Sequence, residues 1–183
     1  MKKFQNWMVL FLCPVLVVGA YYGYLHESGN FHTVVGNQAY RSRQLDHWEL
    51  IHYISSYKIR SILNLRGMNT GAEWYEDEVR ASHELDVLHY DLEMSANREL
   101  SNEELSAIVV IMHDAPKPIL IHCRSGADRT GLIAAVYQYT MDHQKAEKAS
   151  AQLSILYGHF PFFGNSTAAM DRTFWRYVST HAN

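Results

Sequence analysis

One short segment combines residue types and spacing that suit chemistry on an anion. From His122 to Gly131 the chain reads His-Cys-Arg-Ser-Gly-Ala-Asp-Arg-Thr-Gly, which places Arg129 six positions after Cys123. A tetrahedral dianion needs several donors, and a short loop can turn successive backbone N–H groups inward while the next helix adds its positive end. The planar guanidinium of Arg129 matches two oxygens of such an anion. The segment is therefore suited to hold a phosphate group next to a thiol.

Cys123 is the candidate nucleophile of this segment. Helix N-termini and nearby cations favour a thiolate over a thiol, and Gly126 permits the backbone torsions that a loop around an anion requires. Thr130 can donate its hydroxyl to the sulfur, which would ease departure of the thiolate when a phosphoenzyme breaks down. A buried, inert thiol is the alternative for any lone cysteine. The residues around Cys123 favour the reactive thiol.

The predicted elements place this segment at the end of a sheet. An apolar run predicts a buried strand at 119–122, directly before Cys123, and a largely apolar helix is predicted at 130–141. Further strands are predicted at 61–65 and 87–92, and further helices at 46–57, 74–85, 105–112, 145–157 and 173–180. A capping-box pattern at 101–104 precedes the helix at 105–112. Strands separated by helices indicate an α/β domain with a mostly parallel sheet flanked by helices. Ligands of such sheets bind beyond the carboxyl ends of the strands.

The segment resembles a known signature. His-Cys, five residues, Arg and then Thr-Gly is similar to the phosphate loop of protein tyrosine phosphatases, and the chain looks closest to the atypical dual-specificity branch found in bacteria. Tyr40 to Gln44 also resembles the start of that domain, and Ser61 to Arg66 resembles its first core strand. The resemblance implies hydrolysis of phosphate monoesters through a cysteinyl-phosphate intermediate, without a metal or an organic cofactor. It also implies that the phosphate is bound by the loop residues Arg124, Ser125, Gly126, Ala127, Asp128 and Arg129.

The implied mechanism requires a carboxylic acid that protonates the leaving oxygen and then activates water. Asp91 is the preferred candidate, because it ends the strand predicted at 87–92, about where the family places its acid loop; an aspartate that only caps or orients the loop is the alternative. Glu93 and Glu99 flank the same loop. Asp128 is a separate rival, because myotubularin-like phosphatases resemble this loop in having Asp immediately before the Arg and are thought to use it as the acid.

Several substrate classes and functions are compatible with these residues. A phosphotyrosine or phosphoserine/threonine protein is the expected substrate. Inositol phosphates or phosphoinositides are the alternative, although they usually require extra lysines in the loop, and here Asp128 lowers the local charge. A pseudophosphatase that binds phosphate without turnover is the alternative from another class; the intact Cys123 and Arg129 argue against it. A persulfide transferase of the rhodanese type would have a shorter loop.

Other conspicuous side chains are expected to have structural roles. Arg41 and Arg43 are expected in surface salt bridges more than at a substrate, and His122 is expected to buttress the loop by hydrogen bonding. The aromatic cluster 160–163 is expected to pack in the core or a loop, with the wall of the pocket as the alternative.

The chain begins with a candidate membrane segment. Lys2 and Lys3 precede a run without charged residues from Trp7 to Leu25, about 19 residues and close to the ~20 that a membrane-spanning helix needs. We expect residues 1–27 to form an uncleaved anchor in the inner membrane, with the phosphatase-like domain, residues 28–183, on the periplasmic side. A signal peptide cleaved near 18–20 is the alternative, and a buried helix of a soluble protein is the weaker third interpretation.

Composition excludes some functions. The formal net charge of −3 gives no basic surface for nucleic acid, and the 11 histidines are scattered without a His-x-x-x-His pair, so no metal site is expected. Cys13 lies in the apolar run, which leaves Cys123 as the only cysteine of the domain and excludes a disulfide within it. An unpaired thiol in an oxidising compartment suits a reactive nucleophile. The sequence carries no signal for an oligomeric state.

Overall fold

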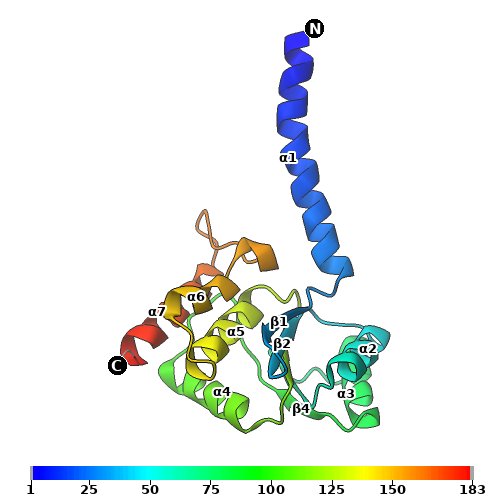
Figure 1. The fold of residues 1–183 in the computed structure, drawn as a ribbon, viewed down its shortest axis with the longest axis vertical. Helices are drawn as coiled ribbons and strands as arrows, with labels where there is room; N and C mark the ends of the chain where they lie inside the picture. Colours follow the sequence, from blue (N-terminus) through cyan, green and yellow to red (C-terminus); the bar gives the residue numbers. More distant parts are fainter. Residues whose placement is uncertain (1, 182–183) are drawn as a thin grey trace.

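The chain folds as a five-stranded α/β domain that follows a long N-terminal helix (Figure 1). The computed structural model describes residues 2–181, with side chains described at residue 13 and from residue 16 onward. The strands are β1 (His32–Val35), β2 (Ala39–Ser42), β3 (Ser61–Asn64), β4 (Leu88–Asp91) and β5 (Ile119–His122). The helices are α1 (Lys2–Glu27), α2 (His47–Tyr57), α3 (Glu73–Glu84), α4 (Asn102–Asp114), α5 (Asp128–Thr140), α6 (Ala146–Ala149) and α7 (Ala168–His181), with 3₁₀ turns η1 (Ser150–Gln152) and η2 (Ile155–Tyr157).

The sheet has the order β1-β2-β5-β3-β4, and only the β1–β2 pair is antiparallel. The mostly parallel sheet that the sequence predicted is therefore confirmed. In its register Ser42, His122, Asn64 and Asp91 lie side by side at the carboxyl ends of β2, β5, β3 and β4. The segment that begins at Cys123 thus leaves the sheet at its centre, between the ends of two neighbouring strands.

Helices cover both faces of the sheet, as predicted. On one face Leu63, Ile119 and Ile121 pack in a core cluster with buried residues of α4, α5 and α7. On the other face Ile62 and Leu120 pack with residues of α2 and α3. Alternating side chains of β3 and β5 therefore enter opposite cores, which is the pattern of a strand buried on both sides.

Two helix starts show the chemistry that fixes them. Ser101 and Glu104 form the predicted capping box before α4, and Asp46 and Glu49 form a second one before α2. In each box the first side chain accepts from the backbone N–H of the third helical residue, whose own side chain accepts in return. These boxes define where the helices begin.

Two parts of the sequence prediction were wrong. Neither β1 nor β2 was predicted as a strand; in β2, Tyr40 and Arg41 do not follow the alternating or apolar pattern that marks one. The helix predicted at 145–157 is instead broken into α6, η1 and η2. The break lies at Leu153 and Ser154, whose backbones leave the helical region.

The predicted anchor region is helical. Helix α1 extends away from the domain in Figure 1, and its described side chains from Leu16 to Ala20 are exposed, which contradicts the interpretation as a buried helix. None of the helices meets the length and hydropathy of a membrane span over the residues that the structure describes. The side chains of Trp7 to Leu12, the first part of the predicted span, lie outside those residues. Membrane anchoring therefore stays a prediction.

Candidate active site

The predicted phosphate loop connects β5 with α5. Cys123 follows β5 directly and is almost fully buried, and α5 begins at Asp128. Gly126 has a φ of +72°, and a Cβ atom at this position would lie 2.7 Å from the backbone of Ser42 and Arg43. Only glycine fits both the torsion and the close approach of β2. The loop therefore has the tight curvature expected for a segment that wraps around an anion.

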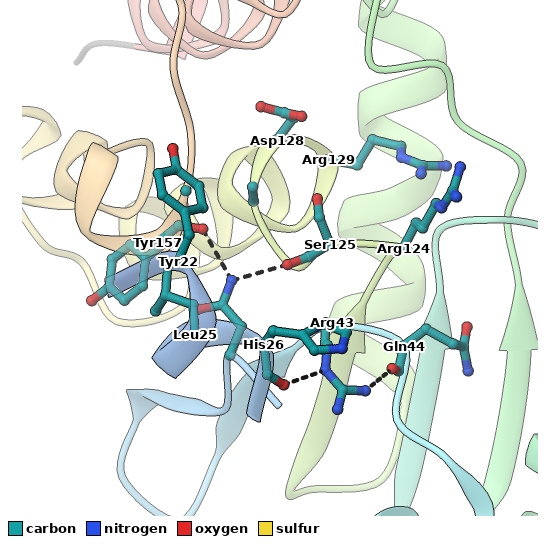
Figure 2. A pocket seen from close by; sticks show the side chains of 13 residues that line it. Tyr22, Leu25, His26, Arg43, Gln44, Arg124, Ser125, Asp128, Arg129 and Tyr157 are labelled. Atoms are coloured by element: carbon teal, nitrogen blue, oxygen red, sulfur yellow. Dashed lines mark hydrogen bonds between the residues drawn. The ribbon is translucent and has the colours of Figure 1, made fainter. Parts of the chain in front are cut away.

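A cavity of about 560 Å³ opens over this loop. Figure 2 shows its lining, in which the guanidinium groups of Arg124 and Arg129 lie on the same side. Five predicted phosphate-binding residues line it, namely Arg124, Ser125, Ala127, Asp128 and Arg129, and the remaining wall comes from Tyr22, Leu25, His26, Asn30, Arg43, Gln44, Tyr157 and Gly158. Gly126 and Cys123 are buried and are not part of this lining. The lining is rich in cations, as a site for an anionic ligand requires.

Arg129 is held in place by the ends of two strands. Its Nη1 donates to the carbonyl of Leu65 at 3.1 Å and to the carbonyl of Met94 at 3.2 Å. Within the described part of the chain, its Nε and Nη2 have no hydrogen-bond partner, so they remain able to donate to a ligand. Thr130, also predicted at the site, is buried, and its Oγ1 likewise has no partner among the described residues. Its hydroxyl is thus free to donate.

Arg41 corrects a prediction. It forms no salt bridge with any residue that the structure describes, and its side chain is fully buried behind the loop. Nη2 donates to the carbonyl of Gly126 at 2.6 Å, and Nη1 donates to the carbonyl and the side-chain oxygen of Gln152 at 2.8 and 2.7 Å. Burial lowers the pKa of Arg41 to about 10, although the charges of Tyr157 and Cys123 act in the opposite direction. Sequence reasoning missed this residue because an arginine is rarely buried without a carboxylate.

Arg43 forms the predicted salt bridge and also lines the cavity, the alternative considered for it. Its Nη2 forms an ion pair with Glu49 at 2.8 Å. Its Nε also donates to the carbonyl of His26, at the end of α1, at 2.8 Å. Tyr21 donates to the carbonyl of Leu156 at 2.6 Å. These contacts fix the end of α1 against the cavity.

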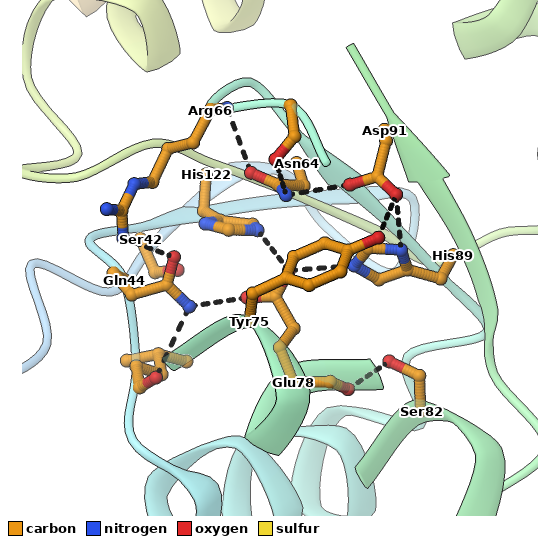
Figure 3. A network of polar contacts seen from close by, with 12 residues as sticks. Ser42, Gln44, Asn64, Arg66, Tyr75, Glu78, Ser82, His89, Asp91 and His122 are labelled. Carbon is orange, nitrogen blue, oxygen red and sulfur yellow. Dashed lines mark hydrogen bonds and ion pairs between the residues drawn. The ribbon is translucent and has the colours of Figure 1, made fainter. Parts of the chain in front are cut away.

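The carboxylate of Asp91, the preferred acid candidate, already accepts hydrogen bonds from other side chains. Its Oδ1 accepts from Asn64 Nδ2 at 2.8 Å, and its Oδ2 accepts from the hydroxyl of Tyr75 at 2.6 Å (Figure 3). Burial, together with this bond, raises the pKa of Tyr75 to about 12. Asp91 is not among the residues that line the cavity. It lies two strands from β5, or about 10 Å at the usual strand spacing.

Neither glutamate candidate lines the cavity. Glu99 forms ion pairs with Arg172 at 2.7 Å and with Arg176 at 2.6 Å, and so connects the loop before α4 with α7. Glu93 is exposed and forms an isolated backbone bridge with Arg66. The positions of these two residues suit structural roles.

Asp128 is the one acid candidate that lines the cavity. Its Oδ1 contacts Nδ1 of His159 at 2.6 Å, and Nε2 of His159 contacts Asp171 Oδ2 at 2.9 Å. The side chain of His159 is completely buried. Burial lowers the pKa of His159, but the two carboxylates outweigh this effect and raise it to about 9. His159 is therefore a cation at neutral pH, and it orients the Asp128 carboxylate.

Comparison with known proteins agrees with this geometry. A family model described as "Tyrosine phosphatase family" matches residues 22–150, which is more than half of the chain. The chain belongs to the tyrosine phosphatase family. No curated protein matches it at a significant level.

Solved structures of phosphatases have the same fold. P. aeruginosa TpbA has a TM-score of 0.61 and 18% identity over 86% of this chain and 93% of its own. A TpbA variant in complex with pTyr has a TM-score of 0.57 and 18% identity, over 81% and 90% of the two chains. The core catalytic domain of the PP-IP phosphatase SIW14 from S. cerevisiae has a TM-score of 0.60 and 22% identity, over 82% and 91%. At these identities the similarity establishes the fold alone.

A buried polar network lies under the loop of this tyrosine phosphatase family member (Figure 3). Glu78 Oε1 contacts Nε2 of His122 at 3.1 Å and Nε2 of His89 at 2.8 Å, and Gln44 Nε2 donates to Oε2 at 2.5 Å. Burial raises the pKa of Glu78, but the two histidines outweigh it and hold it well below its usual range. His122 therefore supports the loop through Glu78, consistent with the predicted hydrogen-bonding role.

The aromatic cluster packs within its own loop, one of the predicted arrangements, and not in the core: the ring centre of Phe160 lies 5.1 Å from that of Phe162 and 6.1 Å from that of Phe163. All three side chains are exposed, and the cavity wall next to them is formed by Tyr157 and Gly158. In the same stretch, sequence reasoning missed His159. No periodicity marks it, and its partner Asp171 approaches only through the packing of α7, so the pair could not be found before the fold was known.

Proposed function

We propose that this protein hydrolyses phosphate monoesters with Cys123 as the nucleophile. The observation that carries the proposal is the position of Cys123, buried directly before the loop whose residues Arg124 and Arg129 line the cavity and which leads into α5. The N-terminus of that helix and the two guanidinium groups favour both a bound phosphate dianion and an ionised thiol.

In the proposed first step the Cys123 thiolate attacks phosphorus, and the bond to the leaving oxygen breaks as that oxygen receives a proton. Arg129 donates to the phosphoryl oxygens, on which negative charge is concentrated. In the second step water attacks the cysteinyl phosphate and gives its proton to the carboxylate that acted as the acid, the S–P bond breaks and phosphate leaves. The free hydroxyl of Thr130 is suited to donate to the departing thiolate.

We assign the proton transfer to Asp128 in place of Asp91. Asp128 lines the cavity, whereas both carboxylate oxygens of Asp91 already accept hydrogen bonds from Asn64 and Tyr75. A general acid must come within hydrogen-bond reach of the leaving oxygen. The contact of Asp128 with His159 uses Oδ1, which leaves Oδ2 for the substrate.

A phosphotyrosine protein is the proposed substrate class. The complex of a TpbA variant with pTyr supports it, because that protein shares this fold. An inositol phosphate is the second candidate. It is favoured by the fold of the PP-IP phosphatase SIW14 and by Arg43 and His26, which add positive or titratable groups to the cavity wall beyond the loop.

Turnover of an aryl phosphate by the purified full-length chain tests the function. We expect hydrolysis of para-nitrophenyl phosphate that vanadate inhibits and that Cys123→Ser abolishes. Wild-type turnover in Cys123→Ser would disprove the nucleophile. Vanadate binding without turnover by the wild-type protein would identify a pseudophosphatase. Comparison of a phosphotyrosine peptide with inositol phosphates at equal concentration then separates the two substrate classes by kcat/KM.

We further propose that α1 holds the domain at the periplasmic face of the inner membrane. The support is the uncharged run from Trp7 to Leu25 after Lys2 and Lys3. Protease added outside intact spheroplasts should digest the domain, and release of a shortened, soluble form would indicate a cleaved signal. Full protection would contradict export.

A further inference from the structure

Arg41 is a buried cation that contacts the phosphate loop from behind. Its Nη2 donates to the carbonyl oxygens of Gly126 at 2.6 Å and Ala127 at 3.4 Å. Its Nη1 donates twice to Gln152, and its guanidinium lies 4.1 Å from the centre of the Tyr157 ring. Four elements of the chain thus meet at one side chain: β2, the loop, η1 and η2.

The neighbours of Arg41 do not neutralise it. No carboxylate pairs with it among the described residues, and its Nε is buried without a partner there. A buried charge without a counter-ion is strongly destabilising. Burial lowers the pKa of Arg41 to about 10, and the charges of Tyr157 and then Cys123 act in the opposite direction. An anion in the site, either the thiolate or a bound phosphate group, would compensate this cation from the other side of the loop.

We propose that Arg41 is a positioning residue of the active site, which fixes the inward direction of the loop N–H groups and favours the Cys123 thiolate from behind the loop. The inference rests on the proposed function and extends it to a residue outside the signature loop.

The geometry of the peptide bond explains the first effect. In a trans peptide the C=O and the following N–H point in opposite directions. Because Arg41 holds the carbonyl of Gly126 toward itself, the N–H group of Ala127 points away from it, on the side of the cavity. The carbonyl of Ala127 also accepts from the N–H of Gly131 at 2.8 Å, in the first turn of α5. The planar guanidinium holds this loop with Nη2 and Gln152 with Nη1 at the same time. The ammonium group of a lysine cannot reproduce this arrangement.

The second effect is electrostatic. The charged or titratable groups around Cys123 are His122 on β5, Arg124, Asp128 and Arg129 on the loop and the start of α5, Arg66 after β3 and Arg41 on β2. Arg41 is the one fully buried arginine in this set, so solvent screens its charge least. Its removal should therefore make an anion at Cys123 or in the cavity less favourable.

Two substitutions separate charge from geometry. Arg41→Lys keeps the cation and loses the fork, whereas Arg41→Met loses both. Arg80→Met is the matched control, because Arg80 is an exposed arginine on α3 that pairs with Asp77 away from the site. Circular dichroism and the thermal midpoint establish whether each variant is folded.

The readouts are inhibition by vanadate and the pH profile of alkylation of Cys123 by iodoacetamide. Alkylation is followed by mass spectrometry, because Cys13 is a second thiol. Arg41→Lys should weaken inhibition by vanadate about tenfold, the effect of losing one charge-assisted hydrogen bond. It should keep the pH profile of alkylation near that of the wild type. Arg41→Met should weaken inhibition by vanadate further and shift the pH profile of alkylation to higher pH. Arg80→Met should change neither.

The proposal fails if Arg41→Lys binds vanadate as the wild type does, or if folded Arg41→Met keeps the wild-type alkylation profile. If Arg41→Met does not fold, Arg41→Lys alone decides the positioning role through vanadate. If the wild-type protein lacks turnover, the proposed function fails. The role of Arg41 can still be tested in that case, by measuring vanadate binding with calorimetry and by alkylation of Cys123.

Discussion

At the scale of single residues, the choice of the general acid depends on which side chains surround each candidate carboxylate in the fold. The sequence favoured Asp91 over Asp128 as the acid, but of these two only Asp128 lines the cavity. Asn64 and Tyr75 each donate to one oxygen of Asp91 and hold its carboxylate at the end of β4. The sequence contains both carboxylates, and only their neighbours in the fold separate their roles.

Substitution of Asp128 should reveal its role through the leaving group. Asp128→Asn should lower kcat/KM for phenyl phosphate, whose leaving oxygen needs a proton, about 100-fold. For an activated ester with an acidic phenol the loss should be less than about tenfold. Steady-state kinetics with both esters measure this. Asp91→Asn, the matched control, should lower thermal stability and reduce both rates equally; a loss confined to phenyl phosphate in this variant would return the acid role to Asp91.

His159 should make stability depend on pH in the alkaline range. Its pKa is raised from 6.5 in the unfolded chain to about 9 in the fold. Protonation therefore stabilises the folded state fully below about pH 6.5, and this contribution disappears as the pH rises through about 9. His159→Asn leaves two carboxylates facing each other and should cost about 3 kcal/mol at pH 7. Urea unfolding at pH 7 and pH 10 measures the difference, which should shrink at pH 10; an equal difference at both values would contradict the charged pair.

At the scale of elements, the sequence was informative where a pattern is local. The strand at 119–122 and the capping box at Ser101 were correct because alternation, apolar runs and caps depend on neighbours along the chain. Strand β2 was missed because its burial comes from pairing with β5 and from the contact of Arg41 with the loop. The signature loop could be recognised, but the supports behind it, such as Gln152 and Glu78, are brought there only by tertiary packing.

The contact between β2 and the loop predicts a strict requirement at Gly126. A methyl group at this position meets the backbone of Ser42 and Arg43 at 2.7 Å, and φ is +72°. Gly126→Ala should therefore displace the loop, lower kcat/KM about 100-fold and cost about 2 kcal/mol of stability. Kinetics and thermal unfolding measure both. Gly164→Ala is a control at a similar φ of +75° with open space around it, and it should leave kcat/KM unchanged. Equal losses of activity in both variants would show that the torsion alone matters.

At the scale of the whole molecule, α1 is both the predicted anchor and a wall of the cavity. Tyr22, Leu25 and His26 line the same cavity as Arg129, and Arg43 links His26 to the domain. Residues about 100 positions before the nucleophile therefore shape the space above it. Substrate recognition should accordingly depend on a segment that lies outside the signature loop.

Tyr22→Ala tests this wall without touching the loop. Loss of the ring should raise KM for an aryl phosphate about fivefold, roughly 1 kcal/mol of apolar contact. The value of kcat should stay near that of the wild type, because Cys123 and Asp128 are unchanged. Inhibition by inorganic phosphate should also stay the same, since phosphate contacts the loop alone. Tyr24→Ala, an exposed residue of α1 outside the cavity lining, is the control. If phosphate inhibition weakens together with aryl phosphate binding, α1 acts by supporting the loop, and its direct contact with the substrate is disproved.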